Sequence, residues 1–200
     1  MKKFLLLTCI AFFTAANAYA TGPYVAAKAK YVITKDEVKA KGFSEEKSKF
    51  DDNVWGGSFA FGGIINYRYG DLRYELEYTQ NSTAKKRGVK VRTQGLLFNA
   101  YYDFNLRTYL PIKPYIGAGV GWGHTEFVAD ELSVKNNGFA AQIGAGINIR
   151  ILSRTYLDLG YRYMVYDDFD IKYRGANNTN QKVEYRPRAH EIALGLRYEF

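Results

Sequence analysis

The sequence predicts an all-β fold, an eight-stranded antiparallel up-and-down transmembrane β-barrel. Three observations support this prediction: strict alternation in the C-terminal strand, a secretory leader at the N-terminus, and connections of alternating length between the strands. Successive side chains of a strand point to opposite faces, so a two-residue period indicates a sheet with two different environments.

The last eleven residues, 190–200, form the clearest strand. Its apolar face contains Ile192, Leu194, Leu196, Tyr198 and Phe200, and its other face contains Glu191, Ala193, Gly195, Arg197 and Glu199. In a soluble barrel the apolar face points inward, whereas in a transmembrane barrel it points outward to lipid. An apolar face that ends in two aromatic residues is typical of outer-membrane barrels and favours the second arrangement.

The N-terminus has the features of a secretory signal peptide. Lys2 and Lys3 precede an apolar run that is too short to span a bilayer, and a small-x-small cleavage pattern ends at Ala20. We therefore expect a cleaved signal peptide at residues 1–20 and a barrel domain at residues 21–200. The single cysteine, Cys9, lies in the leader, so disulfide and thiol chemistry are not expected in the mature chain.

Seven further segments alternate in the same way, at about residues 24–33, 54–67, 72–79, 93–105, 115–125, 138–151 and 156–166. In chain order, their apolar faces include Val25 and Tyr31, Phe59 and Phe61, Leu76 and Tyr78, Leu96 and Phe98, Ile116 and Trp122, Ile143 and Ile149, and Leu159 and Tyr161. The chain contains 18 Tyr, 13 Phe and 19 Gly, which suits a small barrel with aromatic girdles.

The connections between these segments alternate in length. Residues 70–71, 106–114 and 152–154 are short or restricted by proline, whereas residues 34–53, 80–93, 126–137 and 167–187 are long and polar. Outer-membrane barrels have short periplasmic turns and longer extracellular loops. The pattern therefore predicts both termini on the periplasmic side and four extracellular loops, which we expect to be mobile.

The second face of the strands carries charges of both signs. It contains Arg73, Glu75, Glu77, Asp103, Arg150, Asp158, Arg162, Glu191, Arg197 and Glu199. Unpaired charges are costly to bury, but acids and bases inside a narrow barrel can pair. Eight strands leave an interior just wide enough for side chains. We therefore expect a packed lumen charge network that holds the strands in register, with a narrow ion path as the alternative.

Four segments carry a family resemblance: residues 55–62 (WGGSFAFG), 72–78 (LRYELEY), 98–104 (FNAYYDF) and 114–121 (PYIGAGVG). They resemble the small outer-membrane β-barrel family, which includes OmpA-type and Opa-type barrels and many surface antigens of Gram-negative bacteria. The resemblance covers the whole mature chain. It implies insertion by the outer-membrane assembly machinery, which would recognise a C-terminal signal at Leu194, Leu196, Tyr198 and Phe200.

One predicted loop is strongly basic. Between residues 80 and 93 it contains Lys85, Lys86, Arg87, Lys90 and Arg92 and no acidic residue. This segment is a candidate for contact with lipopolysaccharide phosphates or with sulfated or sialylated host glycans. The alternative is a solvated loop beside an anionic surface. Neither a base-reading element nor a stacking platform accompanies the charge, so no nucleic-acid partner is expected.

The other loops give no metal or cofactor prediction. Residues 34–53 have a mixed charge, and such loops carry adhesion or antigenic variation in the family that the chain resembles. Asp167, Asp168 and Asp170 lack the ordered spacing of a calcium loop. We expect neither a metal nor a cofactor.

The candidates for a catalytic base are His124 and His190. Both lie on the predicted lipid-facing side near the outer rim, where a lipid-modifying enzyme could place a base. No serine partner is evident, so no catalytic residues are predicted. The sequence predicts a monomeric outer-membrane protein of a Gram-negative bacterium with a structural or adhesive surface role. A lipid A-modifying enzyme and a narrow ion channel are the alternatives.

Overall fold

The computed structural model describes residues 22–41, 47–82, 84–86, 89–106, 111–129, 132–167, 169–174, 180–186 and 188–200. The predicted signal peptide at residues 1–20 lies outside this set and stays a prediction. Among the described residues, no helix has the length and apolar character needed to cross a membrane.

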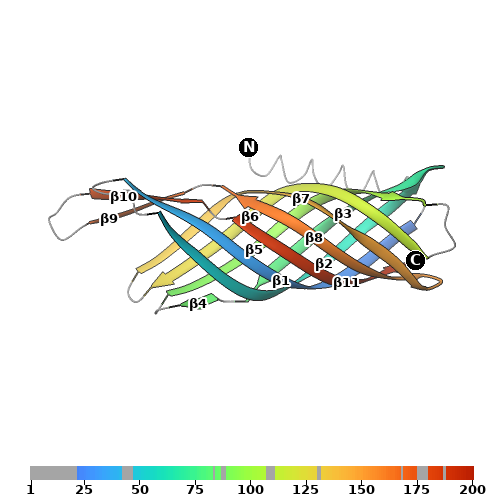
Figure 1. Cartoon of the computed structure of the whole chain (residues 1–200), viewed down its shortest axis with the longest axis horizontal. Helices are drawn as coiled ribbons and strands as arrows, with labels where there is room; N and C mark the ends of the chain where they lie inside the picture. The colour runs from blue at the N-terminus through green and yellow to red at the C-terminus, as the bar shows by residue number, and fades with distance from the viewer. Residues whose placement is uncertain are drawn as a thin grey trace.

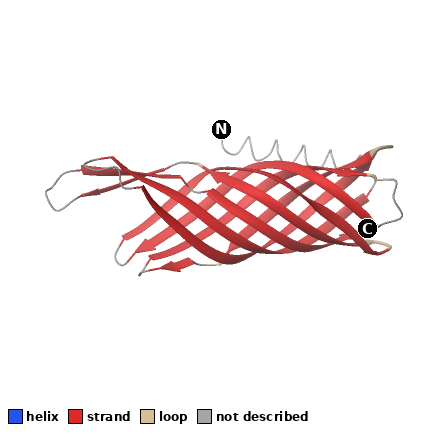
Figure 2. Cartoon of the chain, viewed as in Figure 1, coloured by secondary structure: helices blue, strands red, loops and turns tan. Residues whose placement is uncertain are grey.

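The described chain is built of antiparallel strands (Figures 1 and 2). The strands are β1 (Gly22–Lys41), β2 (Lys47–Asn66), β3 (Gly70–Asn81), β4 (Ala84–Lys86), β5 (Val89–Phe104), β6 (Ile112–Ala129), β7 (Leu132–Leu152), β8 (Thr155–Tyr166), β9 (Phe169–Arg174), β10 (Asn180–Arg186) and β11 (Arg188–Glu199). Eight of them form the ring β1-β2-β3-β5-β6-β7-β8-β11, and β11 closes it by pairing with β1 from Tyr24↔Glu199 to Thr34↔Ala189. The predicted eight-stranded up-and-down barrel is confirmed.

The apolar face of the strands points outward. On β11, Leu194 and Leu196 are 54% and 53% exposed, whereas Glu191 and Arg197 are 0% and 2% exposed. The same pattern holds on the other barrel strands, where the exposed large side chains include Phe59, Leu96, Ile116, Trp122, Ile143 and Leu159. An outer surface of this kind suits lipid, and the buried polar face suits the interior of a membrane barrel.

Glycines on β6 make room for larger side chains inside the barrel. A Cβ atom at Gly117 would meet the ring of Tyr101, and one at Gly119 would meet the side chain of Asn99. Both partners lie on β5, which pairs directly with β6. The glycine-rich face of β6 therefore allows the inward side chains of β5 to lie close against its backbone.

The strands run further than the sequence analysis expected. β1 and β2 stay paired through Lys39↔Lys47, and β6 and β7 stay paired through Ala129↔Leu132. β4 forms a short hairpin with β5, and β9 and β10 form a hairpin whose second strand pairs with β1. Most of the residues predicted to form four loops are thus strand, and this part of the prediction was wrong.

We call the sheet formed by β9, β10, residues 35–41 of β1 and residues 47–52 of β2 the distal sheet. Its strand order is β9-β10-β1-β2. In Figure 1 it projects from one end of the barrel, at the end opposite the short β2–β3 and β7–β8 turns. Long strand extensions on one side and short turns on the other match the expected extracellular and periplasmic ends.

Candidate functional site

The barrel interior holds a cluster of charged side chains, which we call the interior charge cluster. It contains five bases and five acids: Lys28, Lys30, Arg73, Arg162 and Arg197 with Glu75, Glu77, Asp103, Asp158 and Glu191. These residues come from β1, β3, β5, β8 and β11, and each occupies an inward position of its strand. Equal numbers of the two signs allow the charges to be buried without a net charge.

Asp103 on β5 organises the half of the cluster nearer the short β2–β3 and β7–β8 turns. Arg73 approaches it with two nitrogens, at 3.1 Å from Nε to Oδ2 and 3.2 Å from Nη2 to Oδ1. Asn148 donates from Nδ2 to Oδ1 at 3.1 Å, and Arg197 Nη1 lies 3.5 Å from Oδ2. One carboxylate therefore contacts side chains from β3, β7 and β11, and the two-nitrogen Arg73 pair is the stronger type of ionic hydrogen bond.

Glu75 on β3 organises the middle of the cluster. It accepts hydrogen bonds from Lys28 Nζ at 2.8 Å, Tyr24 Oη at 2.8 Å and Tyr101 Oη at 3.1 Å. Asn99 Nδ2 donates to it at 3.2 Å. A buried carboxylate needs several donors to replace lost water, and Glu75 has donors from β1 and β5.

Arg162 on β8 organises the half nearer the distal sheet. Its Nη1 lies 2.8 Å from Glu77 Oε2, and its Nε donates to Glu191. Lys30 Nζ lies 3.3 Å from the same Glu191 and also donates to Thr79. The guanidinium thereby connects carboxylates on β3 and β11.

Inward tyrosines stack on the interior arginines. The Arg73 guanidinium carbon lies 4.2 Å from the ring centre of Tyr101 and 5.0 Å from that of Tyr115. The Arg197 guanidinium carbon lies 4.6 Å from the ring centre of Tyr156. These contacts stabilise cations where water is scarce. These tyrosines were not predicted as members of the site, although their positions on the polar face of their strands were available as a signal.

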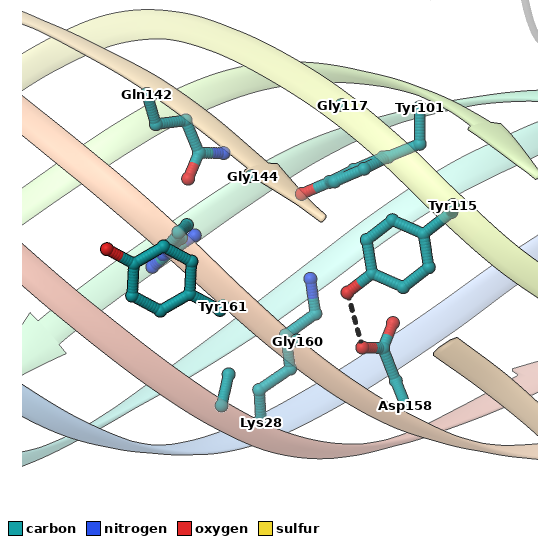
Figure 3. A pocket seen from close by; sticks show the side chains of 11 residues that line it. Lys28, Tyr101, Tyr115, Gly117, Gln142, Gly144, Asp158, Gly160 and Tyr161 are labelled. Carbon is teal, nitrogen blue, oxygen red and sulfur yellow. Dashed lines mark hydrogen bonds between the residues drawn. The ribbon is translucent and has the colours of Figure 1, made fainter. Parts of the chain in front are cut away.

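A small cavity of about 20 Å³ lies within the cluster (Figure 3). Lys28, Tyr101, Tyr115 and Asp158 line it, and Tyr115 Oη donates to Asp158 at 2.8 Å. Nη2 of Arg162, another lining residue, has no hydrogen-bond partner among the described residues. The volume suits about one water molecule, which would satisfy such a group.

An apolar layer covers the cluster on the side of the distal sheet. It consists of Val32, Leu97, Ala140, Met164 and Ala189, all at most 4% exposed. Each lies two positions beyond an inward polar residue, as Met164 lies beyond Arg162 on β8. With this layer above and a water-sized cavity below, the described interior is packed with side chains.

The predicted lumen residues divide into three groups. Eight of them lie buried inside the barrel: Arg73, Glu75, Glu77, Asp103, Asp158, Arg162, Glu191 and Arg197. Glu199 is partly exposed and lies 3.4 Å from Arg197 Nη2. Arg150 differs from the expectation: it is exposed, next to the irregularity in the β7–β8 register. The predicted set left out Lys28 and Lys30, although both occupy the polar face of the alternating segment 24–33.

The predicted basic segment is divided between two strands. Lys85 and Lys86 lie on β4, Lys90 and Arg92 lie on β5, and Arg87 lies outside the described residues. Lys85 is paired directly with Lys90, and the exposed Arg92 is paired with Glu126. The positions of Lys85, Lys90 and Arg92 therefore share one face of the sheet, and Lys86 occupies the other.

The two histidines lie on the outward face of their strands. His124 contacts Asn137 through Nδ1, and His190 Nδ1 lies 2.6 Å from Tyr161 Oη. Neither of these partners is a serine or a carboxylate, so the contacts described for the two histidines include no serine–histidine or histidine–carboxylate pair. Among the described residues no group of His, Cys, Asp and Glu is arranged to hold a metal ion.

The residues of the predicted assembly signal form an exposed stripe. Leu194, Leu196, Tyr198 and Phe200 are all outward and exposed. The rings of Tyr198 and Phe200 meet edge to face with their centres 5.3 Å apart. The signal's recognition by the assembly machinery stays a prediction.

The fold and the interior define a small transmembrane β-barrel with a lipid-compatible surface and a packed, charged core. The chain belongs to the outer membrane protein β-barrel domain family, whose model matches residues 4–200. Membership places it in the outer membrane of a Gram-negative bacterium.

Relatives and solved structures agree with this assignment. Opacity protein V28 of Neisseria gonorrhoeae is 24% identical over 93% of this chain and 100% of its own length. Neisserial surface protein A superposes with a TM-score of 0.65 at 22% identity, over 90% of this chain and 99% of its own. The outer membrane protein OprG of Pseudomonas aeruginosa gives a TM-score of 0.54 at 13% identity, over 90% and 97%. At these identities the structures support the fold alone.

Proposed function

We propose that this protein is a surface barrel with a structural and adhesive role, in which the transmembrane part anchors extracellular strands that contact partners outside the cell. After removal of the signal peptide, the chain would be inserted as a monomer by the outer-membrane assembly machinery. Its partners would be lipopolysaccharide and a ligand on a host-cell surface.

The distal sheet is the observation that carries this proposal. β10 pairs with β1 from Glu37↔Arg186 to Lys41↔Lys182, and β9 pairs along β10 from Asn180↔Arg174 to Tyr185↔Phe169. The sheet is therefore joined by main-chain hydrogen bonds to a strand that crosses the membrane. A rigid scaffold that displays a surface element is the usual arrangement for recognition.

The packed interior supports an anchoring role over a transport role. The interior charge cluster, its cavity of about 20 Å³ and the apolar layer fill the described barrel. The extracellular end of the protein offers charged strands, including the exposed Arg92 next to Lys90 and Lys85 on β4 and β5. We assign contact with anionic saccharides or lipopolysaccharide phosphates to this basic segment, residues 85–92.

Replacement of the distal hairpin tests the proposal. Residues 166–187 would be exchanged for a two-residue Asn-Gly turn, which joins β8 to β11 directly and keeps the pairing of Val165 with Arg188. The barrel should still assemble, shown by its heat-dependent gel mobility, while attachment of the bacteria to host cells falls.

The matched control shortens the β6–β7 connection at residues 127–134 in the same way, because β6 and β7 also extend beyond the barrel. If host-cell attachment falls in the first variant but not in the control, attachment is assigned to the distal sheet. A strain lacking the whole protein that keeps normal envelope integrity and normal host-cell attachment would refute the proposed role.

A further inference from the structure

Each face of β1 stays on the same side of the sheet where the strand extends beyond the barrel. Ala27 and Ala29 are exposed, whereas Lys30 and Val32 are buried, so odd-numbered positions face lipid. The β1–β2 register has no shift from Gly22↔Ile64 to Lys39↔Lys47. The odd-numbered positions of residues 35–41 therefore lie on the outer face, which continues the lipid-facing side of the barrel.

Cross-strand pairing extends this assignment over the whole distal sheet, because directly paired positions share a face. The outer face contains the positions of Lys35, Glu37, Lys39, Lys41, Lys47, Lys49, Asp51, Asp170, Lys172, Arg174, Asn180, Lys182, Glu184 and Arg186. The inner face includes the positions of Val38, Ala40, Phe50, Phe169, Ile171, Tyr173, Val183 and Tyr185. Compared with the membrane part, the polarity is reversed: the outer face is charged and the inner face is largely apolar.

One row of the outer face has three lysines opposite one another. Lys41 on β1 pairs with Lys182 on β10, and Lys182 pairs with Lys172 on β9. Like charges that are directly opposite in a sheet weaken the pairing. The row crosses the β1–β10 junction, through which the β9–β10 hairpin is attached to β1. None of its three positions is an acid.

Most other basic residues of the same face have an acid directly opposite; the exceptions are Lys47, which pairs with Lys39, and Arg174, which pairs with Asn180. Lys35 pairs with Asp51, and Glu37 has Lys49 on one side and Arg186 on the other. The lysine row is thus distinguished by its pairing and not by its overall composition.

The position of the row indicates the kind of anion that surrounds it. Lys41 lies eight residues beyond Ile33, the last outward apolar residue of β1. At roughly 3.3 Å per residue and a tilt of about 40°, this places the row about 20 Å above the apolar belt. On the lipid-facing side at that height lies the saccharide layer of lipopolysaccharide.

We propose that Lys41, Lys182 and Lys172 form a binding site for phosphate groups on the sugars of surrounding lipopolysaccharide. A phosphate monoester carries a charge of about −1.5 to −2 and presents three acceptor oxygens, so it can neutralise adjacent ammonium groups. Binding would remove the repulsion within the row and hold the β9–β10 hairpin against β1. The site is separate from the basic segment on β4 and β5.

The test compares two variants with equal charge changes on the same face. The row variant is Lys41→Gln, Lys172→Gln and Lys182→Gln; the control variant is Lys35→Gln, Lys49→Gln and Arg186→Gln. Both should keep the heat-dependent gel mobility of the folded barrel. Affinity of the detergent-extracted full protein is measured for purified lipopolysaccharide, for the same material stripped of phosphate, and for heparin.

We expect the row variant to lose about tenfold or more in lipopolysaccharide affinity and the control variant about twofold. Removal of phosphate from the lipopolysaccharide should reduce wild-type binding at least to the level of the row variant, because the basic segment on β4 and β5 also loses its phosphate contacts. Amide hydrogen exchange in β9 and β10 should slow on lipopolysaccharide addition in the wild type and the control variant but not in the row variant. Equal losses in both variants, or binding that ignores phosphate, would overturn the proposal. Loss of heparin binding alone would also overturn it and assign the row to a sulfated polysaccharide instead.

Discussion

Arg162 and Glu77 join opposite walls of the barrel, with Nη1 of the guanidinium 2.8 Å from Oε2 of the carboxylate. β8 and β3, which carry them, are separated by four steps in either direction around the ring of eight strands. The same guanidinium also donates to Glu191 on β11. A single side chain thereby fixes the distance between strands that share no main-chain hydrogen bonds.

Arg162→Met should destabilise the barrel strongly, because it leaves Glu77 and Glu191 buried without this guanidinium. Removal of one partner of a buried ion pair costs about 3–5 kcal/mol. The free energy of unfolding would be measured by urea titration in lipid vesicles. Adding Glu77→Leu to Arg162→Met should recover part of the loss, whereas Arg150→Met, at an exposed position, should change little. Equal stability of Arg162→Met and the wild type would show that the bridge is dispensable.

Gly117→Val should disturb the interior, because its Cβ would meet the ring of Tyr101, which donates to Glu75. Overpacking of this kind typically costs about 1–3 kcal/mol. Gly57→Val is the matched control, since a Cβ there lies 3.6 Å from the nearest atom, the carbonyl oxygen of Lys28. The temperature at which the gel mobility shifts should fall for the first variant and stay nearly constant for the second. A larger fall for Gly57→Val than for Gly117→Val would show that the glycine face of β6 does not point into the barrel.

The purified protein should show no unitary conductance in planar bilayers. The described interior contains a cavity with room for about one water molecule, and an apolar layer including Leu97 and Met164 lies above it. A hydrated ion needs a wider and continuous path. Regular channel events that disappear in Arg162→Gln or Arg197→Gln would establish the ion-channel alternative.

His124→Ala and His190→Ala should leave the lipid A mass spectrum of the cells unchanged. The ring nitrogens of the two histidines contact Asn137 and the hydroxyl of Tyr161, and neither contact is a serine–histidine or histidine–carboxylate pair. A change in lipid A mass that either substitution abolishes would instead support the enzyme alternative.

The alternation of side chains was enough to predict the barrel but not the contacts inside it. Period-two patterns on β3 and β11 correctly placed Glu75, Glu77 and Glu191 in the interior. Alternation assigns a residue to a face, however, and cannot tell which side chains meet across the ring. The bridge from Arg162 to Glu77 depends on closure and strand stagger, which only the three-dimensional arrangement defines.

The distal sheet was missed because its polarity is the reverse of the membrane part. Residues 37–41 still alternate, since Val38 and Ala40 are interleaved with the charged residues Glu37, Lys39 and Lys41, but the polar composition suggested a loop. Ile171, Tyr173, Val183 and Tyr185 repeat the pattern on β9 and β10. The period was therefore a usable signal, whereas the pairing of β10 with β1 was not predictable from it.

The electrophoretic mobility of the protein from the outer-membrane fraction, unheated and boiled, tests the central claim most directly. A barrel closed by β1–β11 pairing and braced by the interior charge cluster should resist detergent and shift in mobility only after boiling. A protein found soluble in the periplasm, with the same mobility before and after boiling, would contradict the account.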